Sequence, residues 1–227
     1  MITPRFVYSS INRSTIDGKR HYLLPNGDSV ASVTTILAET KAAEDKEALE
    51  NWRKSIGYQQ AEQITMESAN RGTRMHRWLE NYIQNDEIGT PGSHPASIQS
   101  HKMASIIIEN YLSKNVTAYY GSECNLYCSG LYAGTTDVVA DWNGTLSIID
   151  FKQTNKPKKD DYVHDYKCQI VSYAVAHNEM FGTEINQGVI LMCSQEFQPQ
   201  HWVLKGEEFQ HYMELWLKRL EEYYESR

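Results

Sequence analysis

The sequence predicts an α/β protein in which a central mixed β-sheet is flanked by helices, with a helical elaboration in the N-terminal half. Three observations support this fold class. The pattern of apolar residues gives the order helices, three strands, helix, two strands, helix. An Asn143-Gly144 pair between two β-rich runs predicts a tight antiparallel hairpin. The helical stretch between Lys152 and Gly188 is long enough to connect two parallel strands.

The composition is that of one folded domain. The chain has 227 residues and a formal net charge of −7. We expect a single domain over 1–227, made of a hairpin or lid (1–31), a helical part (32–114) and a sheet-containing core (115–227). The acidic balance argues against nucleic-acid binding by overall charge, so any such affinity must be local. No run resembles a signal peptide, a transit peptide or a membrane span, so we expect a cytoplasmic protein with no membrane partner.

The first 114 residues predict a small hairpin or lid followed by helices. Ser32 is expected to cap a short helix that ends at Glu39. Arg71-Gly72 interrupts a longer helical pattern, so Thr73 is expected to begin a separate helix. The other helices are expected over 42–56, with an apolar stripe of Leu49, Trp52 and Ile56, and over 58–84 and 97–114.

The remaining residues predict the strands of the sheet and two helices. Strands are expected over 115–127, on both sides of Asn143-Gly144, and over 188–193 and 201–205. A helix over 162–180 is expected to stop at Gly182. The final helix carries an apolar stripe that is expected to face the core: Phe209, Tyr212, Met213, Trp216, Leu217, Leu220 and Tyr224.

The turn at Asn143-Gly144 fixes the register of the central hairpin. Both positions of a type I′ turn need positive φ, which Asn-Gly tolerates best. Such a turn pairs Trp142 with Thr145. Counting outward along the two strands then places Asp137 directly opposite Asp150.

The two facing aspartates predict a metal site. Their Cβ atoms would lie roughly 5 Å apart, beside the apolar Val139 and Ile148. Carboxylates in such surroundings repel each other, and a divalent cation removes that repulsion, so replacing either by Asn should stabilise the metal-free fold. Lys152, on the same face, would place a positive charge next to the metal. The alternative is that Asp137 and Asp150 are solvated positions on an exposed sheet face.

Five other side chains are candidates to complete the site. His76 and Glu80 project from one helix face, and His76 is either a third metal ligand or a hydrogen-bonded histidine. Gln169 and Tyr173, also four residues apart, are either site residues or a polar helix edge. A further carboxylate, Glu123, is either auxiliary to the site or an exposed strand residue. The oxygen ligands suit Mg²⁺ or Mn²⁺, and an imidazole favours Mn²⁺.

Basic residues adjoin these candidates in a chain that is otherwise acidic. One group surrounds His76 and the other follows Lys152: Arg71, Arg74 and Arg77, then Lys156, Lys158 and Lys159. They are either a solvated face or a track for a phosphate backbone. If the flanking helices and the loop 153–161 close over the metal as an arch, only a flexible single strand with a free end can enter. An open groove is the alternative.

Four motifs occur in an order that resembles a known nuclease superfamily: His76 on its helix, Gly134-Thr-Thr-Asp137, Ile149-Asp150-Phe-Lys152 and Gln169-x-x-x-Tyr173. Their series is similar to that of the RecB-like branch of the PD-(D/E)xK nucleases. The resemblance is closest to the mitochondrial genome maintenance exonuclease group. It covers about residues 30–225, including 32–37, 71–76, 155–158 and 216–220.

The resemblance implies a restriction-endonuclease-like core and a metal-dependent exonuclease that acts on single-stranded DNA near free ends. It implies that Mg²⁺ or Mn²⁺ is held by His76, Asp137, Asp150 and the backbone carbonyl of Phe151. It also implies that Lys152 positions or activates the attacking water, with Gln169 and Tyr173 in support. Some relatives hold an iron–sulfur cluster on one early and three late cysteines, whereas the cysteines here are placed differently, so we expect none.

Other functions stay open at this point. The chain could be a catalytically silent nucleic-acid-binding or assembly module, a structure-specific flap endonuclease, or a metal phosphatase for small esters. The sequence favours a bacterial or phage origin, with the cytoplasm of a bacterial or phage-infected cell as location. It identifies no protein partner, no cleavage polarity and no oligomeric state.

Overall fold

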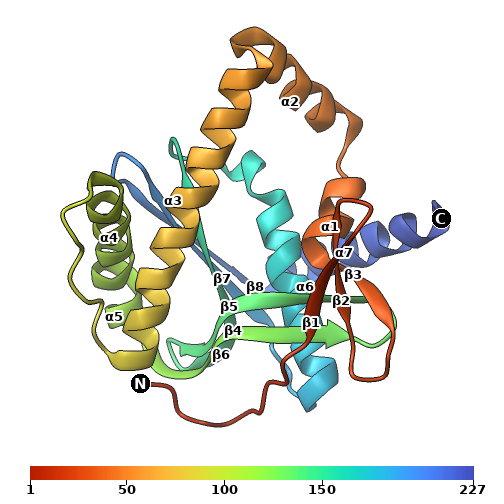
Figure 1. Ribbon diagram of the computed structural model, residues 1–227. Helices are drawn as coiled ribbons and strands as arrows, with labels where there is room; N and C mark the ends of the chain where they lie inside the picture. Colours follow the sequence, from red (N-terminus) through yellow and green to blue (C-terminus); the bar gives the residue numbers. More distant parts are fainter.

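A computed structural model describes residues 1–227, and its central feature is an eight-stranded mixed sheet with helices on both faces (Figure 1). The strands are β1 (Asn12–Ile16), β2 (Lys19–Leu23), β3 (Ser29–Ser32), β4 (Val116–Cys128), β5 (Tyr132–Trp142), β6 (Thr145–Thr154), β7 (Gln187–Ser194) and β8 (Pro199–Lys205). The main helices are α1 (Val33–Glu39), α2 (Ala43–Ile56), α3 (Tyr58–Asn85), α4 (Pro95–Ile107), α6 (His164–Phe181) and α7 (Gly206–Glu225). Shorter turns of helix are η1 (Ile108–Leu112), α5 (Ser113–Asn115) and η2 (Asp160–Tyr162). The predicted fold class is confirmed.

The sheet combines antiparallel and parallel pairs. Its strands follow the order β1-β2-β3-β5-β6-β7-β8, and β4 pairs with β5. β3 runs parallel to β5 and β6 runs parallel to β7, while the other neighbours are antiparallel. The β6–β7 pair is connected through α6, as expected for the crossover.

The sheet divides in two along one edge of β5. β4 pairs with β5 from Tyr132 to Trp142. On the opposite edge, β3 pairs only with Tyr132 and Ala133, and β6 pairs only with Val138 to Trp142. Because a strand has two hydrogen-bonding edges, residues 134–137 have no strand neighbour on this side. We call residues 134–137 the fork.

Each face of the sheet has its own apolar core. Val139 and Ile148 are fully buried on the face covered by α1, α6 and α7. On the other face Met75 and Leu79 of α3 pack with Ile149 and with α4. The C-terminal half of α3 is therefore pressed against the sheet beside the fork, as its apolar stripe predicted.

The predicted interruption of α3 at Arg71-Gly72 is wrong, because the helix is continuous from Tyr58 to Asn85. A Cβ on Gly72 would lie 3.3 Å from Cγ of Gln153, so the missing side chain allows α3 to approach β6. Thr73 is an interior residue whose hydroxyl donates to the carbonyl of Ala69 at 3.1 Å. Contacts with the sheet thus outweigh the low helix propensity of glycine.

Two apolar stripes lie differently from the expectation. No residue of α2 is buried, so Leu49 and Trp52 face solvent. Figure 1 shows α2 and the first half of α3 projecting away from the sheet. In α7, Leu217 and Tyr224 are exposed, whereas Tyr223 is buried. No helix is both long enough and apolar enough to cross a membrane.

Candidate active site

The predicted hairpin register is confirmed. Trp142 lies opposite Thr145, and the turn residues Asn143 and Gly144 have φ of 50° and 80°. The ladder ends at the Val138–Ile149 pair, one step before the two aspartates. The strands separate there because the Phe151 N–H donates to Oδ2 of Asp137, at 2.6 Å, in place of a β5 carbonyl. Asp137 and Asp150 therefore lie at the fork, one step beyond the last strand pair.

His76 reaches the fork from α3. Its neighbour Met75 is fully buried against the sheet, which fixes the rotation of the helix. Nδ1 of His76 lies 3.2 Å from Oδ1 of Asp137. The Phe151 ring packs edge-on against the imidazole, with the ring centroids 6.0 Å apart. His76 therefore lies beside Asp137, with which it was predicted to share a metal site.

Glu123 of β4 completes a row of three carboxylates. The pairs Ser122–Val138 and Cys124–Thr136 flank it, so it stands across from Asp137. Its φ of 51° interrupts the regular strand at this point. Donor atoms of His76, Glu123 and Asp137 all lie within 4.8 Å of one another. The sequence analysis left Glu123 as an auxiliary candidate, although the register of the β4–β5 hairpin would have placed it opposite Asp137.

Lys152 is paired with Asp150. Its Nζ forms an ion pair with Oδ2 of Asp150 and lies 5.0 Å from the centre of the Tyr166 ring. That carboxylate oxygen is buried and no well-directed hydrogen bond reaches it. Burial alone would lower the pKa of Lys152, but the charges of Asp150 and Asp137 outweigh this and raise it. The side chain therefore remains a cation beside the carboxylates.

The three carboxylates differ in how burial and neighbouring charges shift their pKa values. Burial raises the pKa of Glu123 to about 7, and the charge of Asp137 adds to this. Burial also raises the pKa of Asp150, because Lys152 offsets only part of it. Asp137 differs: burial would raise its pKa, but His76 outweighs this and lowers it. Burial would lower the pKa of His76, and Asp137 raises it to about 9.

This donor set fits a divalent cation. Carboxylate oxygens and one imidazole are ligands for Mg²⁺ and Mn²⁺, and a cation would give a further partner to the buried Oδ2 of Asp150, which no directed hydrogen bond reaches. The Phe151 N–H points toward the fork. Its carbonyl leaves the strand on the same side, as both groups of one strand residue do. His76, Asp137, Asp150 and this carbonyl would hold the ion, with Glu123 as a further oxygen ligand.

Gln169 and Tyr173 of α6 pack beneath the fork. Nε2 of Gln169 donates to the Tyr173 hydroxyl at 3.1 Å, and both side chains are almost fully buried. The Tyr173 ring lies against the backbone of Gly134, where an added Cβ would meet Cε1 at 2.6 Å. Glycine is therefore required for the ring to seat below Asp137.

Replacing Gly134 by Ala is expected to destabilise the protein by about 1–3 kcal/mol, because the new methyl group displaces the Tyr173 ring. The change should appear as a lower melting temperature. Gly92→Ala is the matched control, since a Cβ there meets nothing within 4 Å and its φ is ordinary. Equal melting temperatures for the two variants would contradict the close packing of Tyr173 on the fork.

The predicted basic residues do not form one continuous track. Arg71 is buried and its guanidinium donates to Gln153 at 2.8 Å, to Gln195 at 3.2 Å and to Asn155. This arginine ties α3 to β6 and is not free to contact DNA. The others are spread out: Arg74 is half-buried, Arg77 is exposed beside His76, Lys158 lines a separate hollow with Lys41, and Lys156 and Lys159 face solvent.

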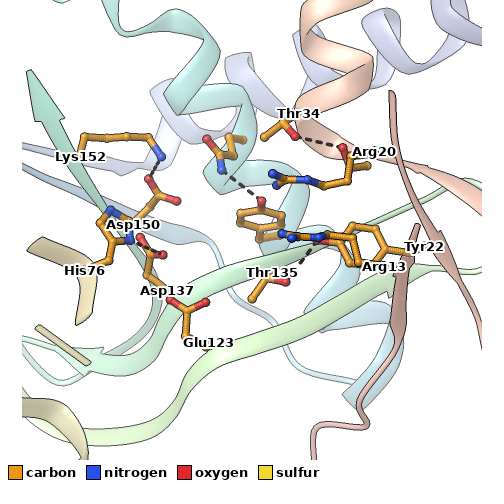
Figure 2. A pocket seen from close by; sticks show the side chains of 14 residues that line it. Arg13, Arg20, Tyr22, Thr34, His76, Glu123, Thr135, Asp137, Asp150 and Lys152 are labelled. Carbon is orange, nitrogen blue, oxygen red and sulfur yellow. Dashed lines mark hydrogen bonds and ion pairs between the residues drawn. The ribbon is translucent and has the colours of Figure 1, made fainter. Parts of the chain in front are cut away.

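The site opens into a polar cavity of about 250 Å³ (Figure 2). This cavity shares Arg13, Arg20, His76 and Glu123 with a hollow of about 580 Å³ along α3. Glu80 lines the outer hollow and lies outside the closest donor group. The wall opposite the carboxylates contains Arg13, Arg20 and Tyr22, which the sequence analysis did not single out. Their place depends on the parallel β3–β5 pair, which no local pattern indicates.

Comparison with known proteins gives relatives by sequence. The mitochondrial genome maintenance exonuclease 1 proteins of Mus musculus and Homo sapiens are 29% and 27% identical to the chain, over 88% and 87% of its length. The chain spans about 60% of the length of these relatives. No protein-family model matches it.

A solved structure of a Eubacterium rectale protein gives a TM-score of 0.48 at 14% identity, over 69% of this chain and 64% of that one. The relationship therefore rests on the sequence similarity and on the motifs that meet at the fork. On these grounds the chain is similar to the mitochondrial genome maintenance exonuclease 1 proteins, and it fits a nuclease of the PD-(D/E)xK type.

Proposed function

We propose that the protein is a metal-dependent DNA exonuclease that hydrolyses single-stranded DNA from free ends. The observation that carries the proposal is the meeting of His76, Asp137 and Asp150 at the fork, with Lys152 paired to Asp150. The names of the sequence relatives support an exonuclease. The polar cavity beside these residues gives a phosphodiester access to them.

Each residue of the proposed site has its own role in the reaction. When bound, Mg²⁺ or Mn²⁺ would neutralise charge on the phosphoryl oxygens. Lys152 donates hydrogen bonds toward the water that attacks phosphorus or toward the phosphoryl oxygen, and its ion pair with Asp150 holds it in place. His76 and the Phe151 N–H keep the Asp137 carboxylate directed at the fork. Gln169 and Tyr173 support this arrangement from below.

The direct test is release of nucleotides from an end-labelled single strand, with Mg²⁺, with Mn²⁺ and with a chelator. We expect cleavage with either metal and none with the chelator. Labels at the 5′ end and, separately, at the 3′ end give the polarity. Protein that binds the strand but cleaves nothing with either metal would leave a silent binding module as the function.

Two other activities have their own outcomes in the same experiment. A structure-specific endonuclease would cut a duplex with a single-stranded flap once, at the junction, and spare a plain single strand. A phosphatase would turn over a chromogenic phosphate ester and ignore DNA. The exposed aromatic side chains of Trp52 in α2 and Tyr58 in α3 fit a single-stranded substrate, because unpaired bases stack on aromatic rings.

Linear single strands are expected to be degraded while circular single strands of the same sequence survive. α2 joins α1 to the far end of α3 (Figure 1), and a strand that passes beneath this connection needs a free end. Gel electrophoresis of the two substrates over one time course measures the difference. Equal rates on both would rule out threading and leave the metal site unaffected.

A further inference from the structure

The hairpin β1–β2 presents two arginines on one face. In its register Arg13 lies opposite Tyr22, and Thr15 lies opposite Arg20. Side chains of directly paired residues share a face, as do those two apart along a strand. Arg13, Arg20 and Tyr22 therefore share one face, which we call the arginine face.

The arginine face is held against the fork. Tyr22 is 3% exposed, and its hydroxyl lies 3.4 Å from the hydroxyl of Thr135, a residue of the fork. Thr35 at the start of α1 donates to the carbonyl of Arg20 at 2.9 Å. The ion pair of Lys19 with Glu39, at 2.6 Å, fixes the end of the hairpin. These contacts hold the hairpin that carries the two arginines beside the fork before any substrate binds.

Both arginines face the carboxylates across the cavity. Arg13 and Arg20 line the same cavity as Asp137, Asp150 and Glu123, and Figure 2 shows their guanidinium groups pointing into it. Neither guanidinium forms a hydrogen bond or an ion pair with the protein. Two cations without a partner in the protein therefore lie across the cavity from the proposed metal ligands, in a chain of net charge −7. The space between the arginines and these ligands can hold an anion.

We propose that Arg13 and Arg20 bind the phosphodiester group next to the one that is cut. This rests on the proposed function, because it assigns the second wall of the same site. Guanidinium groups bind phosphate oxygens through paired hydrogen bonds. One phosphate of the strand then lies at the metal ligands and its neighbour lies at the arginine face, so the substrate is a polynucleotide of at least two phosphodiester groups.

The test compares Arg13→Ala, Arg20→Ala, the double variant and the double Lys variant with Lys114→Ala. Lys114 is an exposed cation of α5, and no ion pair involves it. Affinity for a labelled single-stranded oligonucleotide is measured by fluorescence anisotropy with a chelator present, over a range of salt. KM and kcat for its cleavage are measured with Mn²⁺. Melting temperatures confirm that each variant is folded.

We expect KM and Kd to rise roughly tenfold for each arginine removed, with kcat much less affected, because the contact binds ground and transition states alike. The salt slope of binding should fall by about 0.7 in the double Ala variant, because the two arginines neutralise one phosphate of a single strand. The Lys variant should restore the salt slope but only part of the affinity, since Lys lacks the paired geometry.

Two outcomes separate this proposal from the proposed function. If wild-type protein cleaves the strand and the double Ala variant matches Lys114→Ala in KM and salt slope, the arginine face does not bind substrate. If wild-type protein cleaves nothing, the nuclease proposal fails. The anisotropy measurement still decides whether the arginine face binds the strand.

Discussion

Replacing Asp150 by Asn is expected to lower kcat for DNA cleavage by roughly 10³-fold or more, since loss of metal binding removes several kcal/mol of charge stabilisation. Asp150 supplies a buried oxygen with no directed hydrogen bond, and Asn cannot supply its charge. Calorimetric titration with Mn²⁺ should show weaker binding than in the wild type. Single-turnover kinetics on an end-labelled strand measures the loss of rate.

Asp137→Asn is the matched comparison, and the structure separates the two aspartates that the sequence treated alike. Burial and the charge of Asp137 raise the pKa of Asp150, so the Asn variant at 150 should have a higher melting temperature than the metal-free wild type. Asp137 accepts from the Phe151 N–H and pairs with His76. Its Asn variant should therefore melt at a lower temperature without metal, contrary to the sequence-based expectation. A lowered melting temperature for Asp150→Asn would refute the charge balance described for the site.

Lys152→Ala is expected to reduce kcat by roughly 10²–10³-fold while metal affinity changes little. The ammonium group pairs with Asp150 but is a cation and cannot be a ligand. Its loss removes a hydrogen-bond donor that acts where negative charge develops in the reaction. Metal titrations and single-turnover rates, measured side by side, test the two parts of this expectation.

Lys156→Ala provides the control for charge alone, because Lys156 is an exposed cation two residues beyond Thr154, where β6 ends. It should retain wild-type kcat. If Lys152→Ala lost Mn²⁺ affinity as severely as Asp150→Asn, Lys152 would have to be assigned to maintaining the site. Unchanged cleavage by Lys152→Ala would remove it from the mechanism.

The sequence predicted those parts of the site that depend on local structure. The Asn143-Gly144 turn determines the register of its hairpin within a few residues, so the positions of Asp137 and Asp150 followed from counting. His76 followed from the stripe on its helix, because that stripe decides which side meets the sheet. Burial of Asp137 and Asp150 also followed, since both share a strand face with the apolar Val139 and Ile148.

The parts that were missed depend on contacts distant in the chain. Arg13 and Arg20 reach the site only because β3 pairs in parallel with β5, about a hundred residues later. Arg71 was expected at the surface but meets Gln153 and Gln195, which no local pattern indicates. The continuity of α3 likewise depends on its packing against β6, which compensates for Gly72.

The divided sheet places the proposed metal ligands and the proposed phosphate-binding arginines on separate branches. β6 carries Asp150 and Lys152 on one branch, and β1–β3 carry the arginine face on the other, attached to β5 through only the Ala31–Tyr132 and Ser32–Ala133 pairs. The hairpin that carries the arginine face can therefore be replaced by a different hairpin ahead of α1 without moving a metal ligand. Substrate preference in such chimeras would change while the cleavage reaction stayed the same.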